Sequence, residues 1–312
     1  MLDWLRGGRA PTSKAKVEAD DDLFDDEFQR RLEVLSIVSR RLVAGRTRAE
    51  RRSRKTGSGI EFADHRLYAP GDDFRHLDWN LYARTGRLLL RLYEEEEDLS
   101  VYILLDVSRS MSVGEPHAKL RYAKQLAAAL AYIALANLDR VSIVTFSDEV
   151  TRRLAPTRGK NTIFKVFRFL RALEADGRTG TADAMKTFVA QNRRRGVAIL
   201  ISDLYDPDGF EGGINTLRYH KFEPYVIQVY DPVEVTPPLH GDVRLVDNET
   251  GETREVTITP RVLERYAKAH AAYRARIDDF CTQKHVPHHA VSTALPFDQA
   301  ILDILRRGGL VT

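Results

Sequence analysis

Oxygen-bearing side chains follow directly after a strongly apolar stretch of the chain. Residues 99–112 read LSVYILLDVSRSMS, in which an apolar run is followed by Asp106, Ser108 and Ser110. A carboxylate and two hydroxyls at alternating positions of a short loop can converge on one hard cation, such as Mg²⁺ or Mn²⁺. The same residues could instead cap a following helix. This stretch by itself leaves both interpretations open.

The apolar run predicts the element that positions these side chains. Leu99–Leu105 is too short for a membrane-spanning helix and is typical of a strand buried on both faces of a sheet. Asp106 would then stand where the strand leaves the sheet. Open α/β sheets bind their ligands at that edge, so a binding role for Asp106 is plausible on position alone.

Two later stretches place further oxygen ligands at equivalent positions. Gly177–Thr181 reads GRTGT, a glycine-punctuated loop with two hydroxyls. Val197–Ile201 is a second fully apolar run, and it ends in Ser202 and Asp203. Because the carboxyl ends of parallel strands meet at one edge of a sheet, we expect Thr179 and Asp203 to join the first three residues.

The order of elements predicts the fold class. Apolar runs at 141–146 and 225–230 alternate with stretches of helical periodicity, and 150–154 is a candidate antiparallel edge strand. We therefore expect residues 99–312 to form an α/β domain with a mostly parallel sheet and helices on both faces. A turn signal around Gly251 predicts a β-hairpin insertion near 232–259.

The region before this domain is more heterogeneous. Residues 1–22 predict a flexible tail, and 23–98 an N-terminal segment with a helix over about 25–43 that Gly45 ends, followed by a basic arm over 40–55. We expect 59–93 to pack on the main domain through its aromatic residues: Phe62, Tyr68, Trp79 and Tyr82. Its carboxylates could form a second site or could pair internally with arginines in a turn; these are Asp72, Asp73 and Asp78.

Composition excludes several classes of protein. The 312 residues carry a formal net charge of only +3, so no nucleic-acid partner is expected. The basic arm could bind phosphate or an acidic partner surface, but a solvated arm, or pairing with the chain's own acidic run, explains it better. The single cysteine excludes an internal disulfide, and no apolar run has transmembrane length. We expect a cytoplasmic protein, or one held at the membrane periphery by partners. Three close histidines could bind a transition metal but are better explained as exposed strand-end residues: His285, His288 and His289.

The combined motifs D-x-S-x-S, G-R-T-G-T and a strand ending in S-D resemble the metal-ion-dependent adhesion site of von Willebrand factor A domains. The resemblance implies their mostly parallel α/β fold and a site for Mg²⁺ or Mn²⁺, occupied or empty at rest. Thr179, rather than Thr181, takes the threonine position because it follows Gly-Arg and comes first in the T-x-T pair. The implied metal ligands are Asp106, Ser108, Ser110, Thr179 and Asp203.

A narrower resemblance covers residues 59–84, which read G-x-E-F-A-x-x-R-x-Y-x-P-G-D-D-x-R-x-x-D-W-x-x-x-A-R. This segment, with the D-x-S-x-S strand after it, is similar to a bacterial family known as domain of unknown function fifty-eight. Such proteins are commonly encoded beside MoxR-type AAA+ ATPases. The resemblance implies an adaptor or co-chaperone that works with such an ATPase in the maturation or remodelling of a target protein.

The site chemistry favours binding over catalysis. Two carboxylates and three hydroxyls would leave a divalent cation an open position, which a partner's Asp or Glu could fill. The alternative is a phosphoryl-transfer hydrolase of haloacid-dehalogenase type, but that chemistry uses D-x-D, and Ser108 stands where the general acid should be. No G-x-S-x-G motif surrounds the serines. We therefore predict a protein-interaction module without catalytic residues, and no enzyme.

Overall fold

The computed structural model describes residues 22–50, 56–57, 61–94, 99–114, 118–247 and 251–307. Contacts divide the chain into a small unit, Ala44–Asp98, and a large unit that contains the rest. Of the expected tail at 1–22, all but residue 22 lies outside the described residues, as do the side chains of the basic arm.

A six-stranded sheet forms the centre of the large unit. Its strands are β4 (Ser100–Asp106), β5 (Arg140–Phe146), β6 (Val150–Thr157), β7 (Val197–Ser202), β8 (Glu223–Tyr230) and β11 (His288–Ser292). The order across the sheet is β11-β8-β7-β4-β5-β6, and only the pairing of β5 with the edge strand β6 is antiparallel. The predicted α/β fold with a mostly parallel sheet is therefore confirmed.

Burial on both faces explains why β4 is continuously apolar. Successive side chains of a strand point to opposite faces. Ile103 and Leu105 accordingly enter one apolar core, whereas Tyr102 and Leu104 enter the other. Every residue of β4 is buried. Such a strand cannot alternate apolar with polar residues, as a half-buried strand does.

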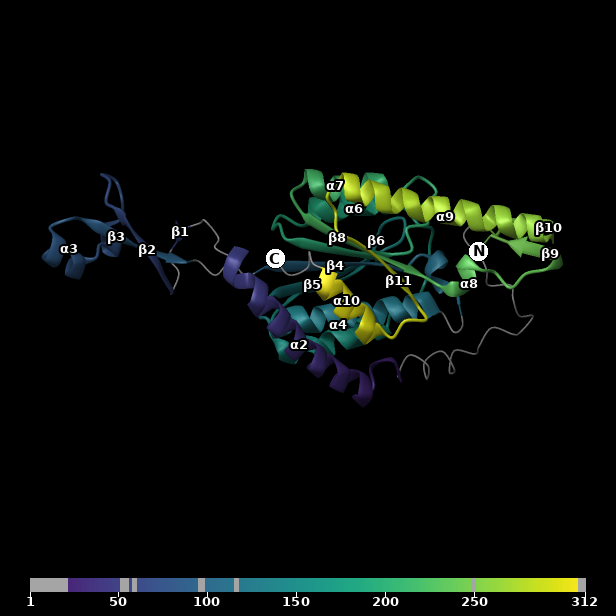
Figure 1. The fold of residues 1–312 in the computed structure, drawn as a ribbon, viewed down its shortest axis with the longest axis horizontal. Coiled ribbons are helices and arrows are strands. Elements are labelled where there is room, and N and C mark those ends of the chain that lie inside the picture. The colour runs from purple at the N-terminus through teal and green to yellow at the C-terminus, as the bar shows by residue number, and fades with distance from the viewer. Residues whose placement is uncertain are drawn as a thin grey trace. The chain divides into compact units, whose positions relative to one another are not determined.

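Helices cover the two faces, as Figure 1 shows. One face carries α4 (Ala118–Ala136), α5 (Ile163–Arg171), α10 (Phe297–Arg307) and the first part of α2 (Asp26–Glu50). The other face carries α6 (Thr181–Gln191), α7 (Glu211–Tyr219) and α9 (Pro260–Gln283). None of the described helices combines the length and the apolar character needed to cross a bilayer.

The first helix differs from the prediction in two respects. It continues past Gly45 to Glu50, so the expected end at Gly45 is wrong. A single glycine inside a helix costs only about 1 kcal/mol relative to alanine, which the neighbouring residues can offset. In addition, its first part packs in the large unit rather than with the rest of 23–98, since Phe28 lies 4.6 Å from Phe297 between ring centroids.

Between β8 and α9 the chain forms a short helix, α8 (Pro232–Val235), and then two antiparallel strands, β9 (Gly241–Val246) and β10 (Thr253–Ile258). These two strands pair only with each other and stand apart from the main sheet. They occupy the region in which the sequence predicts a hairpin insertion. We call residues 232–258 the insertion below.

The small unit is built on a three-stranded antiparallel sheet in the order β1-β3-β2. Its elements are β1 (Thr56–Gly57), β2 (Glu61–Leu67), β3 (Leu89–Glu94) and the helix α3 (Trp79–Thr85). The side chains of Trp79 and Tyr82 are 59% and 42% exposed, and they contact each other edge to face. Docking of 59–93 on the main domain stays a prediction.

The acidic residues of the small unit pair internally. Asp72 binds Arg66, and Asp73 binds Arg75. Asp78 is nearly buried, caps α3 through the backbone N–H groups of residues 80 and 81, and binds both Arg91 and His65. These contacts, Arg91 first, hold the pKa of Asp78 well below its usual range. Of the two explanations that the sequence left open, internal pairing is the one observed.

Replacement of Asp78 should loosen the small unit. In Asp78→Ala the cap of α3 is lost, and Arg91 and His65 lose the carboxylate that joins β2 and β3 to that helix. We expect faster amide hydrogen exchange throughout 61–94, measured by mass spectrometry, with exchange in β4 unchanged. Asp73→Ala removes an exposed carboxylate that binds Arg75 and caps only a short 3₁₀ helix, so it should have a smaller effect. Equal exchange in both variants would show that Asp78 does not organise this unit.

Candidate functional site

Asp106 ends β4 and is completely buried. Its two carboxylate oxygens accept hydrogen bonds from neutral groups: the backbone N–H of Ser108 at 2.8 Å and the hydroxyl of Ser202 at 2.6 Å. The hydroxyls of Ser108 and Ser110 lie 2.9 Å apart, and both side chains are buried. The loop therefore brings all three of its predicted ligands to one point.

The carboxylate of Asp106 has no cationic side chain beside it among the residues that the structure describes. Among the described residues, no lysine, arginine or histidine side chain forms an ion pair with it. Burial, together with the nearby carboxylate of Asp203, raises the pKa of Asp106 to about 7. A buried carboxylate that lacks a cationic partner is costly, and a bound cation would relieve that cost.

The loop with Thr179 is fixed against the same edge by backbone hydrogen bonds. The N–H of Arg109 donates to the carbonyl of Gly177 at 3.0 Å, and the N–H of Gly180 donates to the carbonyl of Ser147 at 2.9 Å. A Cβ at Gly180 would lie only 2.8 Å from the Cα of Asp148, so glycine permits this approach. Thr179 itself is buried on this loop.

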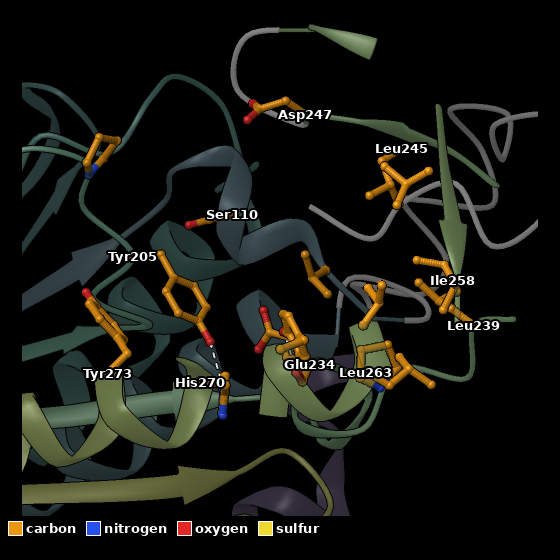
Figure 2. Close-up of a pocket in the computed structure, with 16 residues that line it drawn as sticks. Ser110, Tyr205, Glu234, Leu239, Leu245, Asp247, Ile258, Leu263, His270 and Tyr273 are labelled. Atoms are coloured by element: carbon orange, nitrogen blue, oxygen red, sulfur yellow. Dashed lines mark hydrogen bonds between the residues drawn. The ribbon is translucent and has the colours of Figure 1, made fainter. Parts of the chain in front are cut away.

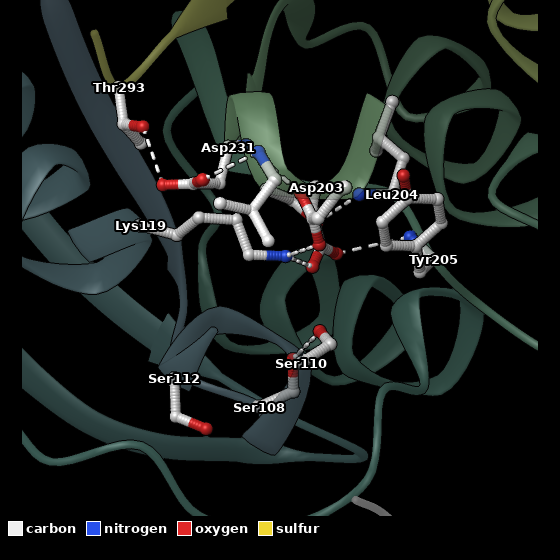
Figure 3. A network of polar contacts seen from close by, with 12 residues as sticks. Ser108, Ser110, Ser112, Lys119, Asp203, Leu204, Tyr205, Asp231 and Thr293 are labelled. Atoms are coloured by element: carbon white, nitrogen blue, oxygen red, sulfur yellow. Dashed lines mark hydrogen bonds and ion pairs between the residues drawn. The ribbon is translucent and has the colours of Figure 1, made fainter. Parts of the chain in front are cut away.

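Asp203 completes the set at the end of β7, but it is already engaged. The ammonium of Lys119 donates to Asp203 Oδ2 at 2.6 Å and to Glu234 Oε1 at 2.6 Å. Lys119 is fully buried, and its Nζ lies 5.3 Å from the centroid of the Tyr205 ring. Figure 3 shows the lysine side chain reaching from α4 toward Asp203, with Ser108 and Ser110 on the adjoining loop.

The surrounding charges keep this lysine protonated. Burial alone lowers the pKa of an ammonium, but the carboxylates of Asp203 and Glu234 outweigh that effect and raise the pKa of Lys119 above its usual value. Glu234 is held in place from the opposite side. Its Oε2 accepts from the N–H of Asp231 at 3.0 Å, as part of the capping box that begins α8.

Sequence reasoning missed both Lys119 and Glu234. Lys119 stands in the first turn of a helix otherwise noted for its apolar stripe, where a lysine normally points to solvent. Glu234 lies in the insertion, 31 residues after Asp203, and no spacing rule joins them. The only available signal was the position of Lys119, directly after the D-x-S-x-S loop.

A cavity of about 460 Å³ opens beside the site. Ser110, Tyr205 and Glu234 line the side next to the site, and most of the other lining residues are apolar side chains of the insertion and of α9, as Figure 2 shows. Within the cavity wall, His270 bonds to the hydroxyl of Tyr205 at 3.1 Å. Ser110, one of the predicted metal ligands, therefore lies at the boundary between the site and this largely apolar cavity.

The donor set suits a hard cation. It offers two carboxylates and up to three hydroxyls, all oxygen, as Mg²⁺ and Mn²⁺ prefer. The described residues hold no group of three or more His, Cys, Asp or Glu side chains placed to bind a metal, which gives no support to a transition-metal site at the histidines. The structure brings Asp106, Ser108, Ser110 and Asp203 together and places Thr179 on the adjoining loop. Their role as ligands stays a prediction.

The three histidines near β11 differ from the expectation of exposed residues. His285 is exposed, but the side chain of His288 is only 6% exposed and binds Asp278 at 2.8 Å. His289 is half-buried. The prediction was wrong for His288 because α9 runs back along the edge strand and covers it with its own acidic residue.

A family model described as "Protein of unknown function DUF58" matches residues 64–276. The chain belongs to the DUF58 family. Among relatives, this DUF58 protein is 28% identical over 260 residues to Rv1480, an uncharacterised protein of Mycobacterium tuberculosis, and the match covers 82% of each chain.

Solved structures with similar folds include the conserved hypothetical protein BatB from Bacteroides thetaiotaomicron. It has 16% sequence identity and a TM-score of 0.42, over 67% of this chain and 98% of BatB. The vWF domain of the pilus tip protein Mfa5 from Porphyromonas gingivalis has 23% identity and a TM-score of 0.28, over 34% and 37% of the two chains. In the part of the chain that the structure describes, the six-stranded sheet of this DUF58 protein has a single antiparallel strand, β6, which lies at its edge.

Neutralising Asp106 should stabilise the metal-free protein. In Asp106→Asn the buried charge and its repulsion of Asp203 are removed, while an amide can still bond to Ser108 and Ser202. We expect the free energy of unfolding in EDTA at pH 7.5 to rise by about 1 kcal/mol or more, from denaturant titration.

The pH dependence of this difference checks its cause. Because the folded-state pKa of Asp106, about 7, is raised above the unfolded value, the parent protein loses stability as the pH rises toward 7. The advantage of Asp106→Asn should therefore fade as the pH falls toward about 4. Asp183→Asn, at an exposed position on α6, is the control and should change little. A destabilised Asp106→Asn at pH 7.5 would contradict the prediction.

Proposed function

We propose that this DUF58 protein is a non-enzymatic protein-interaction module whose binding depends on a divalent cation. The observation that carries the proposal is the buried carboxylate of Asp106, which has hydrogen bonds but no cationic partner among the described residues. It stands beside a second buried carboxylate, Asp203, and two hydroxyls. A divalent cation supplies the missing charge.

The cation would be Mg²⁺ or Mn²⁺, held by side chains from three loops: Asp106, Ser108, Ser110, Thr179 and Asp203. These ligands lie on one edge of the sheet, which leaves the outer side of the cation for another oxygen. An Asp or Glu side chain of a partner protein completes the oxygen shell. Attachment through one carboxylate makes the interaction both cation-dependent and reversible.

The proposed partner is a MoxR-type AAA+ ATPase, with this chain as the adaptor or co-chaperone that connects it to a target protein. The support is the family membership together with the YxPGDDxRxxDW motif that precedes the site strand. In this arrangement the ATPase supplies the energy, and the DUF58 protein supplies a docking surface for the acidic side chain.

The hydrolase alternative finds no support in the site. A phosphatase of haloacid-dehalogenase type needs a general acid two residues after the first aspartate. Ser108 occupies that position, and its hydroxyl pairs with that of Ser110. In the described contacts neither hydroxyl is bonded to a histidine that would activate it as a nucleophile; Ser108 lies against the carboxylate of Asp106 and the hydroxyl of Ser110.

Replacement of Asp106 by alanine should abolish both cation binding and partner binding. Asp106→Ala leaves Asp203 as the only carboxylate of the proposed ligand set, and that carboxylate also binds Lys119. We expect Mn²⁺ affinity, measured by calorimetry, to fall at least tenfold, and the MoxR-type ATPase to be lost from pull-downs in Mg²⁺.

Two controls make this test specific. The ATPase binds Mg²⁺ with its own nucleotide, so chelation by EDTA cannot separate the two sites, whereas Asp106→Ala can. Asp176→Ala removes an exposed carboxylate of the same edge, paired with Arg109, and should leave both kinds of binding intact. If Asp106→Ala binds Mn²⁺ and the ATPase like the parent protein, Asp106 is only a structural residue of the loop.

A further inference from the structure

Lys119 is the most unusual residue of the site, because an ammonium is rarely enclosed completely. Its Nζ is shared between Asp203 and Glu234, at 2.6 Å from each, and faces the ring of Tyr205. Burial of an ammonium is strongly unfavourable without such partners. The lysine is therefore bound to a carboxylate that the proposed cation would also use.

The charges of the cluster add up to the charge of one divalent cation. With all groups ionised, the three carboxylates of Asp106, Asp203 and Glu234 contribute −3 and Lys119 contributes +1, which leaves −2. In the metal-free protein the lysine compensates Asp203 and Glu234 jointly, and Asp106 has no cationic partner among the described side chains. A divalent cation at Asp106 and Asp203 would leave Lys119 to neutralise Glu234 alone.

We propose that Lys119 is a resident cation that competes with the divalent cation for Asp203, and that Glu234 retains the lysine when the divalent cation binds. Glu234 is thus a positioning residue that sets the affinity of the site without contacting the cation. This inference rests on the proposed function, because it concerns the same cation site.

The geometry permits this exchange with little movement. The ammonium already contacts both carboxylates, so it needs to give up only the contact with Asp203. Glu234 cannot shift toward the cation together with Asp203. Its other carboxylate oxygen accepts from the N–H of Asp231, and its backbone carbonyl accepts from the hydroxyl of Tyr266. After the exchange, the cluster contains two neutral groups, and no buried charge is left over.

The two residues should act in opposite directions when they are replaced singly. Lys119→Met removes the competing ammonium at similar length, so Mn²⁺ should bind at least tenfold more tightly. The metal-free protein should at the same time melt at a lower temperature, because two buried carboxylates lose their cation. Glu234→Gln leaves Lys119 with Asp203 as its only carboxylate partner, so Mn²⁺ should bind about tenfold more weakly.

A double-mutant cycle distinguishes positioning from a general effect of charge. If Glu234 acts through Lys119, Glu234→Gln should weaken Mn²⁺ binding in the parent but have little effect in the Lys119→Met background. If Glu234 merely adds negative potential near the cation, the loss should be the same in both backgrounds, and the positioning role would be overturned. Lys186→Met removes an exposed positive charge and is the matched control, expected to bind Mn²⁺ like the parent.

The experiment is Mn²⁺ titration by calorimetry of the full chain and these variants, with melting curves in EDTA and in Mn²⁺. If Lys119→Met binds Mn²⁺ like the parent while Asp106→Ala loses it, the inference fails and the proposed function stands. If Lys119→Met binds Mn²⁺ and the parent protein does not, the lysine occupies the site as proposed here, but the proposed dependence of the native protein on a divalent cation is overturned. If none of the proteins binds, both fail.

Folding of Lys119→Met is not required for a decision. Should that variant be insoluble, Glu234→Gln still tests the role of the lysine and its partner. Unchanged or tighter Mn²⁺ binding by Glu234→Gln overturns the inference in that case. Asp106→Ala reports separately on the proposed cation site itself.

Discussion

The site depends on one constraint: two carboxylates with fully buried side chains stand at the ends of neighbouring parallel strands. Asp106 and Asp203 follow β4 and β7, which pair directly, so the sheet itself forces the two charges together. Hydroxyls, backbone N–H groups and one ammonium are the means by which the protein tolerates this arrangement. These groups come from the loop after β4, from the last residue of β7 and from α4, so the charge pair also determines how these elements must meet.

The insertion helps to stabilise these buried charges. It supplies Glu234, which holds the buried ammonium, and it closes the apolar cavity that begins at Ser110. The short helix α8 is well defined for its size because Asp231 and Glu234 cap it reciprocally and Asp231 also accepts from the hydroxyl of Thr293. A segment that breaks the strand–helix alternation in the sequence therefore contributes directly to the electrostatics of the site.

The sequence predicted what local chemistry determines. Strands buried on both faces must be continuously apolar, so β4, β5, β7 and β8 could be located within one or two residues. Short motifs located the oxygen-bearing side chains at the strand ends, because their residue types and spacing are visible in the sequence itself. The contacts that depend on tertiary packing could not be predicted: Lys119 looks like an ordinary surface lysine of a helix, and the burial of His288 depends on how α9 returns along the sheet. The prediction that the first helix ends at Gly45 was wrong, because a glycine weakens a helix without necessarily ending it.

The N-terminal helix has a consequence for how the protein is made. Its apolar face, which includes Phe28, Leu32 and Leu35, packs with Phe297 of the closing helix, at the far end of the described chain. During synthesis this face leaves the ribosome long before Phe297, which emerges after the strands and helices that lie between them. At 5–20 residues per second, roughly 270 residues separate the two by about 15–50 s. Until the closing helix emerges, this face can pack only against earlier elements such as Phe167 of α5, so part of it stays open to chaperones for most of translation.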